Sequence, residues 1–400
     1  MTAPIQAAAA DYRLGAAVPG EVARPESIDE LAGLLRRWNA DGRAVVPWGG
    51  GVRQELGRPP ARYDVALDVT ALNAVIEYEP ADLTVTVQAG MRIGTLQTLL
   101  AEHGQMVTLE SPFDSRATVG GTLAAGLAGP LSHALGGPRE RLIGLRAVLA
   151  EGSAIHGGGR VVKNVAGYDL PRLFVGSLGT LGVITEASFK LAALPTETAT
   201  AVLPLTRNED GFRVAGAIRD RNLPVRALEI GDTGGRLVLQ IDISGRRLLV
   251  DRLVTELRGI VGATLEIVTG DDHRRLWEAW AGAGFVAPAS AVVRIVVPAS
   301  KVADVVKRMP ERGETRFQAR PSTGVIRAML TSPDAARVTL LRGIASTAGG
   351  HAIIERGPEP LRREISPWDA VQGHEVMQRL RTEFDPRCTL NPGRYVDGVV

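Results

Sequence analysis

The chain has 400 residues and a formal net charge of +2, with 45% hydrophobic and 22% charged residues. This near balance of charge gives no electrostatic reason to expect a nucleic-acid or anionic-lipid partner, and the length suits two or three domains that each bury a core. The single cysteine, Cys388, excludes an intrachain disulfide, and without a CxxC pair the sequence predicts neither an iron–sulfur cluster nor a structural zinc site.

The amino-terminal residues lack a basic start and a long apolar run, so we expect residues 1–20 to form a disordered tail rather than a signal peptide. No stretch reaches the roughly 18 consecutive apolar residues of a membrane span. We therefore expect a cytoplasmic protein whose only route to the inner membrane is through partner proteins.

A helix, a strand and a glycine loop are predicted next. Ser27 fits an N-cap, and Glu30 three residues later completes a capping box for a helix that ends near Gly42. A strand over 44–47 then runs into Trp48-Gly49-Gly50-Gly51-Val52, a loop that can present backbone amides to phosphate oxygens. Taken alone, this loop fits an ordinary tight turn equally well, because it lacks the lysine of a P-loop and the glycine spacing of a Rossmann turn.

Glycine clusters recur later in the first half of the chain. Strands are expected over 65–69, 74–78, 83–89, 142–150, 159–165 and 182–193, with helices over 91–103 and after Pro171. The clusters 117–121 and 176–182 flank the string 163–170. Glycine at this density is typical of backbone that approaches a large flat or phosphorylated ligand. With the loop at 49–51, the clusters favour an extended ligand such as a dinucleotide.

Leu194-Pro195 interrupts this pattern, and glycine clusters become sparser beyond it. Between about 197 and 370, strands alternate with helices, which predicts an antiparallel sheet covered by helices on one face and built from two similar halves. We therefore expect the tail 1–20, a first domain over 21–195, a cap or substrate-type domain over 196–370, and a C-terminal helix and tail over 371–400.

Several motifs give the chain a resemblance to a known family. The motifs Gly49-Gly50-Gly51, Ala117-Thr118-Val119-Gly120-Gly121, Val162 to Leu170 and Gly176 to Thr185 look like the FAD-binding domain of the vanillyl-alcohol-oxidase type flavoproteins. With Asp385-Pro386 and Leu390-Asn391-Pro392-Gly393-Arg394, they most resemble the FAD-binding subunits of bacterial glycolate oxidases. The resemblance covers about 20–195 and the C-terminal tail, whereas 200–370 shows only a compatible pattern.

The resemblance implies an α+β fold, with FAD held across two α/β subdomains in residues 21–195 and a second domain with an antiparallel sheet covered by helices. Residues 49–53 and 117–121 would surround the pyrophosphate, Val183-Ile184 would meet the adenine end, and Asn391-Pro392-Gly393 would return to the flavin. The expected FAD-binding residues are Pro47, Trp48, Gly49, Gly50, Gly51, Val52, Arg53, Pro112, Asp114, Ala117, Thr118, Val119, Gly120, Gly121, Val183 and Ile184. Trp48 and Val52 depart from the family pattern, which often has Arg at the first position and commonly Thr or Ser at the second.

Some relatives attach the flavin covalently through a histidine just beyond the glycine loop, or through a histidine and a cysteine. Residues 48–60 contain no histidine, and the only cysteine is Cys388. We therefore predict FAD that is bound non-covalently and dissociates when the protein is denatured.

Chemistry on a 2-hydroxy acid requires a base, a cation for the carboxylate and a flavin that accepts hydride. Related catalytic subunits carry a histidine-rich motif tied to substrate and metal, and this chain has no such string. Its six histidines are scattered without a metal-ligand spacing. The sequence therefore predicts no metal site and identifies no catalytic residue.

Three interpretations stay open. The favoured one is a FAD-binding oxidoreductase subunit of a glycolate or other 2-hydroxy acid oxidase complex, beside a larger flavoprotein subunit and an iron–sulfur subunit. The second is a self-sufficient FAD-dependent dehydrogenase of another hydroxylated small molecule, with a base and an anion site among residues such as Arg294, Arg327 or His351. The third is an assembly subunit that has lost the flavin.

Four smaller features each have a structural explanation. Lys163 and Tyr168 fit scaffold or flavin contacts, and Asp169 fits the cap of a following helix. Arg362-Arg363 fits a solvated turn, with a docking patch as the alternative. Trp277 and Trp280, three apart on an expected helix, fit core packing better than an interface.

Overall fold

The computed structural model of the chain describes residues 9–159, 169–233, 235–262, 265–285, 290–310 and 315–396. The chain folds as two compact units: unit 1 comprises 1–128, 137–193 and 371–400, and unit 2 comprises 129–136 and 194–370. Most of the predicted strand 159–165, together with Lys163 and Tyr168, lies outside the described residues.

Unit 1 opens with a three-stranded parallel sheet in the order β1 (Glu21–Ala23), β3 (Val65–Asp68), β2 (Val45–Trp48). Helix α1 (Ile28–Ala40) buries Leu31, Leu35 and Trp38 in one cluster with the apolar residues of β2 and β3. Ser27 Oγ accepts a hydrogen bond from Glu30 N at 3.1 Å, which confirms the predicted N-cap. The glycine loop begins where β2 ends.

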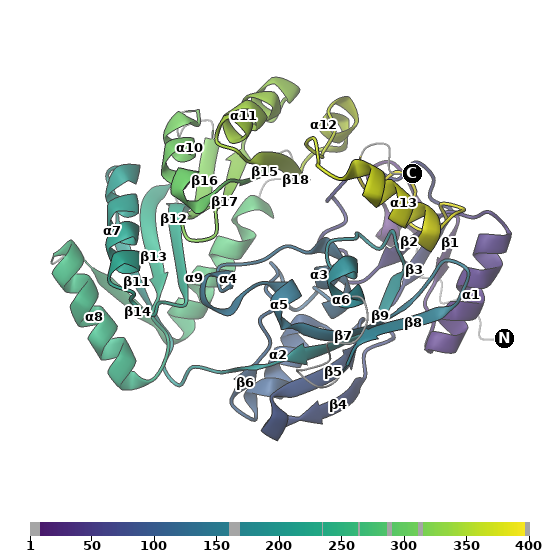
Figure 1. Ribbon diagram of the computed structural model, residues 1–400, viewed down its shortest axis with the longest axis horizontal. Coiled ribbons are helices and arrows are strands. Elements are labelled where there is room, and N and C mark those ends of the chain that lie inside the picture. The colour runs from purple at the N-terminus through teal and green to yellow at the C-terminus, as the bar shows by residue number, and fades with distance from the viewer. Residues whose placement is uncertain are drawn as a thin grey trace. The chain divides into compact units, whose positions relative to one another are not determined.

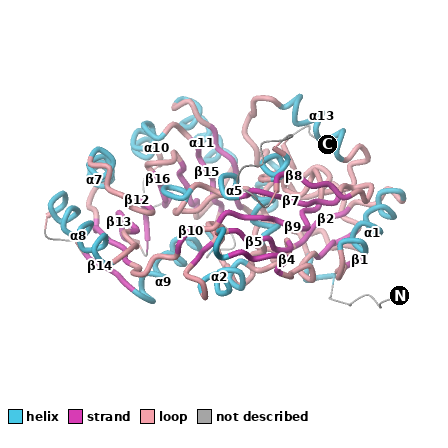
Figure 2. Tube along the Cα trace, turned by 60° about the horizontal axis from the view of Figure 1, so that its bottom comes forward, coloured by secondary structure: helices cyan, strands magenta, loops and turns pink. Residues whose placement is uncertain are grey.

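A five-stranded antiparallel sheet forms the second part of unit 1, and its strands lie side by side in Figure 2. Their order is β4 (Val75–Glu79), β5 (Thr84–Gln88), β9 (Val183–Lys190), β7 (Leu142–Val148), β8 (Ala154–Gly158). Its core receives Ile93 of α2 (Ile93–Ala101), Leu123 of α3 (Val119–Ala125) and Phe174 of α6 (Leu170–Phe174). The two sheets with their helices are the two α/β subdomains that the resemblance implied.

Short elements complete this part of unit 1. Strand β6 (Gln105–Met106) pairs with β10 (Ala192–Ala193), and α5 (Pro138–Arg141) leads into β7. Asp169 Oδ1 accepts a hydrogen bond from Arg172 N at 3.2 Å at the start of α6, which confirms Asp169 as a helix cap.

Residues 9–20 are folded, so the expectation of a disordered tail is wrong for them. A 3-10 helix, η1 (Ala9–Tyr12), is followed by a bridge between Leu14 and Ala17, and Leu14 is buried. Tyr12 Oη donates to Asp68 Oδ2 at 2.6 Å, and its ring meets that of Trp48 edge-on at 5.2 Å. The two aromatic rings fix the segment against β2, a long-range contact that composition does not predict.

The C-terminal segment belongs to unit 1 as well. Helix α13 (His374–Phe384) leads into a tail that runs beside the strand carrying the glycine loop. Leu390 forms a parallel bridge with Val45 of β2, Val45 N donates to Thr389 O at 2.7 Å, and Asn391 N donates to Val45 O at 2.9 Å. The tail therefore adds a further extended segment to the first sheet.

Unit 2 contains an eight-stranded antiparallel sheet in the order β14-β11-β13-β12-β16-β17-β15-β18. Its first half runs β11 (Ala199–Pro204), α7 (Asn208–Asp220), β12 (Ala227–Thr233), β13 (Arg236–Asp242), α8 (Arg247–Val261), β14 (Glu266–Thr269). Its second half runs β15 (Ala291–Val296), α10 (Val302–Arg308), β16 (Thr315–Arg320), β17 (Val325–Leu330), α11 (Ala335–Thr347), β18 (His351–Arg356). Each half repeats one β-α-β-β-α-β order, so the predicted pair of similar halves is confirmed.

Side chains alternate between the two faces of this sheet. One face buries a large apolar core against α7, α8, α10 and α11, as the sequence predicted (Figure 1). Helix α9 (Gly270–Gly282) packs on the other face, where Trp280 joins Val202 and Val238. Trp280 is only 3% exposed and Trp277 packs beside it, which confirms the core interpretation of this pair.

The interpretation of Arg362-Arg363 as a solvated turn is wrong. Both residues belong to helix α12 (Glu359–Glu364), and Arg362 is buried. Arg362 Nε donates to Gly357 O at 2.9 Å, while Arg363 pairs with Glu359 at 2.6 Å one helical turn away. Since the Arg362 side chain lies inside the fold, it cannot contribute to a docking patch.

Candidate cofactor-binding site

A pocket in unit 1 gathers the glycine loop after β2, the start of α3, the turn before β9 and the C-terminal tail. It holds about 800 Å³ of empty space, counting the part that opens to solvent. Its walls are formed by Pro47, Trp48, Gly49, Gly50, Gly51, Val52, Arg53, Gln54, Val69, Ser111, Ala117, Thr118, Gly120, Gly121, Thr122, Ala124, Ala125, Leu178, Gly179, Gly182, Val183, Ile184, Asn391 and Arg394.

The structure brings most of the sequence-predicted residues to this pocket. All of 47–53 line it, as do Ala117, Thr118, Gly120, Gly121, Val183 and Ile184. Pro112, Asp114 and Val119 do not. Pro112 is buried, Val119 belongs to the apolar core as the first residue of α3, and Asp114 is exposed, with its carbonyl oxygen accepting a hydrogen bond from Gly94 N at 3.0 Å.

The glycines of the loop are required first by contacts between backbone segments. A Cβ on Gly49 would lie 2.1 Å from Thr118 Oγ1, and one on Gly50 would lie 1.7 Å from Arg116 O. Arg116 Nη2 in turn donates to Gly50 O at 3.3 Å. The glycine loop and the segment 116–118 therefore approach each other more closely than any side chain would permit, and the pocket lies along the contact.

Backbone amides of the glycine loop are available to a ligand. Among the described residues, no acceptor is found for the N–H groups of Gly49, Gly50, Gly51 and Val52, which all line the pocket. The amides at the start of α3 are already used: Val119 N donates to Met91 O, Gly120 N to Ala89 O, and Gly121 N to Thr118 Oγ1. An amide that a ligand covers needs an acceptor, so the unpaired amides of 49–52 suit a phosphate better than the paired amides of 117–121.

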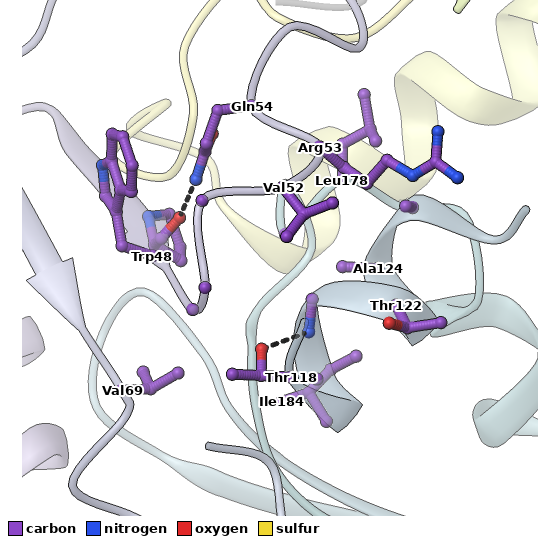
Figure 3. Close-up of a pocket in the computed structure, with 18 of the residues that line it drawn as sticks. Trp48, Val52, Arg53, Gln54, Val69, Thr118, Thr122, Ala124, Leu178 and Ile184 are labelled. Atoms are coloured by element: carbon purple, nitrogen blue, oxygen red, sulfur yellow. Dashed lines mark hydrogen bonds between the residues drawn. The ribbon is translucent and has the colours of Figure 1, made fainter. Parts of the chain in front are cut away.

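Charge and shape also fit an elongated anion. Arg53 and Arg394 are the charged residues among those that line the pocket, and no acidic side chain joins them. Figure 3 shows Thr118 and Ile184 grouped in one region of the pocket and Trp48 with Gln54 in another. A pyrophosphate needs cations and amides, and flat ring systems need small apolar walls, so the residues present fit FAD.

Trp48 occupies the position where the family often has Arg, and its side chain is anchored in the protein. Its indole is 7% exposed, and Trp48 Nε1 donates to Tyr63 Oη at 2.7 Å. Tyr63 Oη donates onward to Tyr12 O at 2.8 Å, and burial raises the pKa of Tyr63 above its ordinary value, which keeps this donor protonated. The tryptophan at this position is therefore fixed by contacts within the protein.

Several pocket residues were not predicted from the sequence. Gln54 and Arg394 are polar and contact each other. Asn391 was expected only near the flavin. The other unpredicted residues are small or apolar and have no chemical signature. The string Leu390-Asn391-Pro392-Gly393-Arg394 indicated that the tail returns to the flavin region. The contact between Arg394 and Gln54 could not be predicted, because the two residues are 340 positions apart.

Unit 2 brings together the residues considered for an anion site. Arg294 on β15 stands directly opposite Arg327 on β17, and His351 lies on the neighbouring strand β18. Arg327 Nη1 donates to Gln318 Oε1 at 3.1 Å and Nη2 lies 3.3 Å from Glu355 Oε1. In the described part of the chain, Arg294 Nε is buried without a hydrogen-bond acceptor, and burial lowers the pKa of Arg294, an effect that the Glu355 carboxylate opposes.

The described residues contain neither a metal-binding group nor a membrane-spanning helix. No group of three or more His, Cys, Asp or Glu side chains is arranged to hold a metal ion. None of the described helices combines the length and apolar character that crossing a bilayer requires.

Comparisons with known proteins agree with this geometry. A family described as "FAD binding domain" matches residues 19–158. The glycolate oxidase subunit GlcE of Escherichia coli is 39% identical over 171 residues, which is 42% of this chain and 48% of that protein. The subunit GlcD of Bacillus subtilis is 26% identical over 94% of this chain and 89% of its own length. The match to GlcE thus spans about half of that relative.

Further relatives extend the same picture. The D-2-hydroxyglutarate dehydrogenase of Xanthomonas citri is 31% identical over 50% of this chain and 43% of its own length. A solved structure of alkyldihydroxyacetonephosphate synthase shares the fold, with a TM-score of 0.66 and 18% identity over 93% of this chain and 75% of that one. The chain therefore carries an FAD-binding domain of the vanillyl-alcohol-oxidase type and is homologous to the subunits GlcD and GlcE of glycolate oxidase.

Proposed function

We propose that the chain is an FAD-binding oxidoreductase subunit of a glycolate or other 2-hydroxy acid oxidase complex. The observation that carries the proposal is the pocket of unit 1, where four consecutive loop amides without a protein acceptor in the described chain stand beside Arg53 and Arg394. Bound FAD would supply a flavin that accepts hydride from the substrate carbon.

Each wall of the pocket has a role in this proposal. Gly49 to Val52 and Arg53 would hold the pyrophosphate, and Val183 with Ile184 would line the adenine end. Thr118 would keep its cap on α3 and so hold the loop in place. Unit 1 would act as the FAD-binding domain, with 371–400 as part of it, and unit 2 as the cap or substrate-type domain.

The partners of the proposed complex are a larger flavoprotein subunit and an iron–sulfur subunit. The chain carries no histidine-rich substrate motif and only one cysteine, so partners would supply the substrate site and the onward electron path. Homology to two different glycolate oxidase subunits supports a multisubunit assembly. The complex would work in the cytoplasm, peripheral to the inner membrane through these partners.

Purification of the tagged chain from its own host tests the proposal. We expect a yellow protein that co-purifies with the two partners and releases its FAD into the supernatant after acid precipitation, since no covalent link is predicted. Flavin retained in the precipitate would overturn non-covalent binding. Full glycolate-to-dye activity of the isolated chain would overturn the need for partners, and a colourless protein that does not bind added FAD would overturn the cofactor.

A second candidate function follows from the facing pair Arg294 and Arg327. Two arginines directly opposite each other repel, and a carboxylate placed between them would satisfy both. Burial and the charge of Arg294 lower the pKa of His351, so that ring is neutral near pH 7 and can accept a proton. This arrangement favours a self-sufficient dehydrogenase of a hydroxylated carboxylic acid.

Anaerobic reduction of the bound flavin by 2-hydroxy acids distinguishes the two functions. The second function predicts that a 2-hydroxy acid bleaches the flavin of the isolated chain. Arg294→Gln should lower the rate of this bleaching at least tenfold. Arg226→Gln, at a partly buried arginine just before β12 that pairs with Asp242 at 3.8 Å, serves as the control and leaves bleaching unchanged. If none of the acids tested bleaches the flavin, the second function is contradicted and the first remains.

A further inference from the structure

Buried side chains of α13 and the C-terminal tail join two separate walls of the pocket. One wall is the glycine loop with its continuation to Leu56, and the other is the turn 178–180 before β9. Asn391 and Arg394 are 3% and 4% exposed, and both also line the pocket. Their contacts show how a segment at the end of the chain determines the geometry of a site built near its start.

Arg394 holds the glycine loop. Its Nη1 donates to Gln54 Oε1 at 2.6 Å, and its Nη2 donates to Gln54 O at 2.5 Å and to Leu56 O at 3.2 Å. Gln54 Nε2 continues to Pro47 O at 3.1 Å, at the other end of the loop. The planar guanidinium thus fixes three acceptors of one loop at once, a geometry that lysine cannot reproduce.

Asn391 holds the turn. Its Nδ2 donates to Leu178 O at 2.6 Å, and Leu178 adopts a left-handed conformation with φ of 53°. This conformation is unfavourable for a residue with a branched side chain and persists only where its surroundings impose it. Asn391 has φ of 47° itself, a conformation that asparagine tolerates better than most residues.

The tail that carries both residues is anchored independently. Arg381 pairs with Asp385 at 3.0 Å, and the two residues are 2% and 0% exposed. Asp385 accepts hydrogen bonds from Thr389 N at 3.0 Å and Leu390 N at 2.7 Å, while Arg381 donates to Leu390 O at 2.6 Å and to Thr180 O. A buried ion pair whose remaining hydrogen bonds are satisfied is costly to open, so the tail is a rigid support.

We propose that Asn391 and Arg394 form a clasp that holds the turn 178–180 and the glycine loop at the spacing FAD requires, so that the tail sets the affinity for FAD. The inference rests on the proposed function in one respect, that the pocket takes FAD. Both are positioning residues, and the clasp takes no part in proton or hydride transfer.

Titration of the full-length apoprotein with FAD, followed by flavin fluorescence, tests the clasp. Arg394→Met and Asn391→Gly each remove one arm, and glycine keeps the left-handed backbone at 391. We expect each to raise the FAD dissociation constant at least tenfold. Arg387→Met is the matched control, because Arg387 belongs to the same tail and donates to Asn39 O of α1 instead of a pocket segment. It should change the dissociation constant less than twofold.

The thermal midpoint of each apoprotein separates positioning from general loss of structure. The clasp predicts weaker FAD binding at temperatures where the variant apoproteins remain folded, with partial recovery in Arg394→Lys, which can restore only some of the three bonds. Should Arg394→Met fail to fold, Asn391→Gly and Arg394→Lys carry the test. Unchanged FAD affinity in the folded variants would overturn the clasp, whereas absence of FAD binding by the wild-type chain would overturn the proposed cofactor site instead.

Discussion

Gly50 lies so close to Arg116 that a Cβ on Gly50 would stand 1.7 Å from the Arg116 carbonyl oxygen. The contact joins the loop after β2 to the segment that starts α3, which are 66 residues apart. Both segments line the same pocket, so the glycine serves the fold and the site together. Relief of the clash requires the two segments to separate, and separation widens the pocket.

Replacement of Gly50 by alanine should therefore weaken FAD binding at least tenfold and lower the free energy of unfolding by about 1–3 kcal/mol, the usual cost of overpacking. Gly33→Ala is the matched control. A Cβ on Gly33 of α1 would meet nothing within 4 Å, and alanine favours a helix, so this variant should gain about 0.5–1 kcal/mol. Flavin fluorescence titration and urea unfolding measure both effects, and equal behaviour of the two variants would contradict the role given to Gly50.

The order of elements and the location of the pocket could be predicted because they depend on local patterns. Ser27 with Glu30 marked the start of α1, and the glycine strings marked the pocket walls. Strand β16 alternates Phe317 and Ala319 with Gln318 and Arg320, and the sequence alone suggests that these two polar side chains face solvent, although both are buried. Arg320 is buried only because Glu229, 91 residues away, neutralises it, and a single sequence does not reveal that pairing.

Other contacts between residues far apart in the sequence could not be predicted either. Tyr12 falls within the predicted disordered tail, yet it packs on Trp48 and donates to Asp68. The family resemblance also implied that 117–121 would surround the pyrophosphate. In the fold the amides of 119–121 bond to Met91, Ala89 and Thr118, so the loop amides are better placed for that role.

Arg294→Met should stabilise the apoprotein by about 1–4 kcal/mol, because it removes a desolvated charge that faces another arginine. Arg226→Met should destabilise it, because Asp242, which is 5% exposed, loses its ion-pair partner. Urea unfolding of the two variants beside the wild type measures the difference. A loss of stability in Arg294→Met as large as that in Arg226→Met would show that the Arg294 charge is compensated in the fold.

The ion pair between Arg381 and Asp385 should be among the most sensitive positions in unit 1. Arg381→Met leaves a carboxylate with no exposed surface unpaired, so we expect a loss of about 3–5 kcal/mol in the free energy of unfolding. Arg247→Met removes an exposed partner of Asp251 at the same i, i+4 spacing and should cost less than about 0.5 kcal/mol. Equal losses in the two variants would refute the special role of the buried pair.

His273 should make stability depend on pH. Burial lowers the pKa of its ring, an effect that Arg226 reinforces and the Asp242 carboxylate opposes, and Nδ1 lies 2.8 Å from Thr200 Oγ1. The unfolded chain takes up a proton at an ordinary pKa of about 6.5, whereas the folded protein does so only at lower pH. Below pH 6.5 the unfolded state therefore binds more protons, and stability falls as the pH falls.

Unfolding midpoints in urea between pH 5 and pH 8 measure this dependence. The wild type should lose stability below about pH 6.5, and His273→Gln should show a shallower loss over the same range. The slope should not vanish, because burial also lowers the pKa values of His133 and His351. At pH 8 the ring is neutral in both states, so the free energies of unfolding of the variant and the wild type should differ only by the lost bond to Thr200. Identical dependence of stability on pH in the two proteins would contradict the prediction.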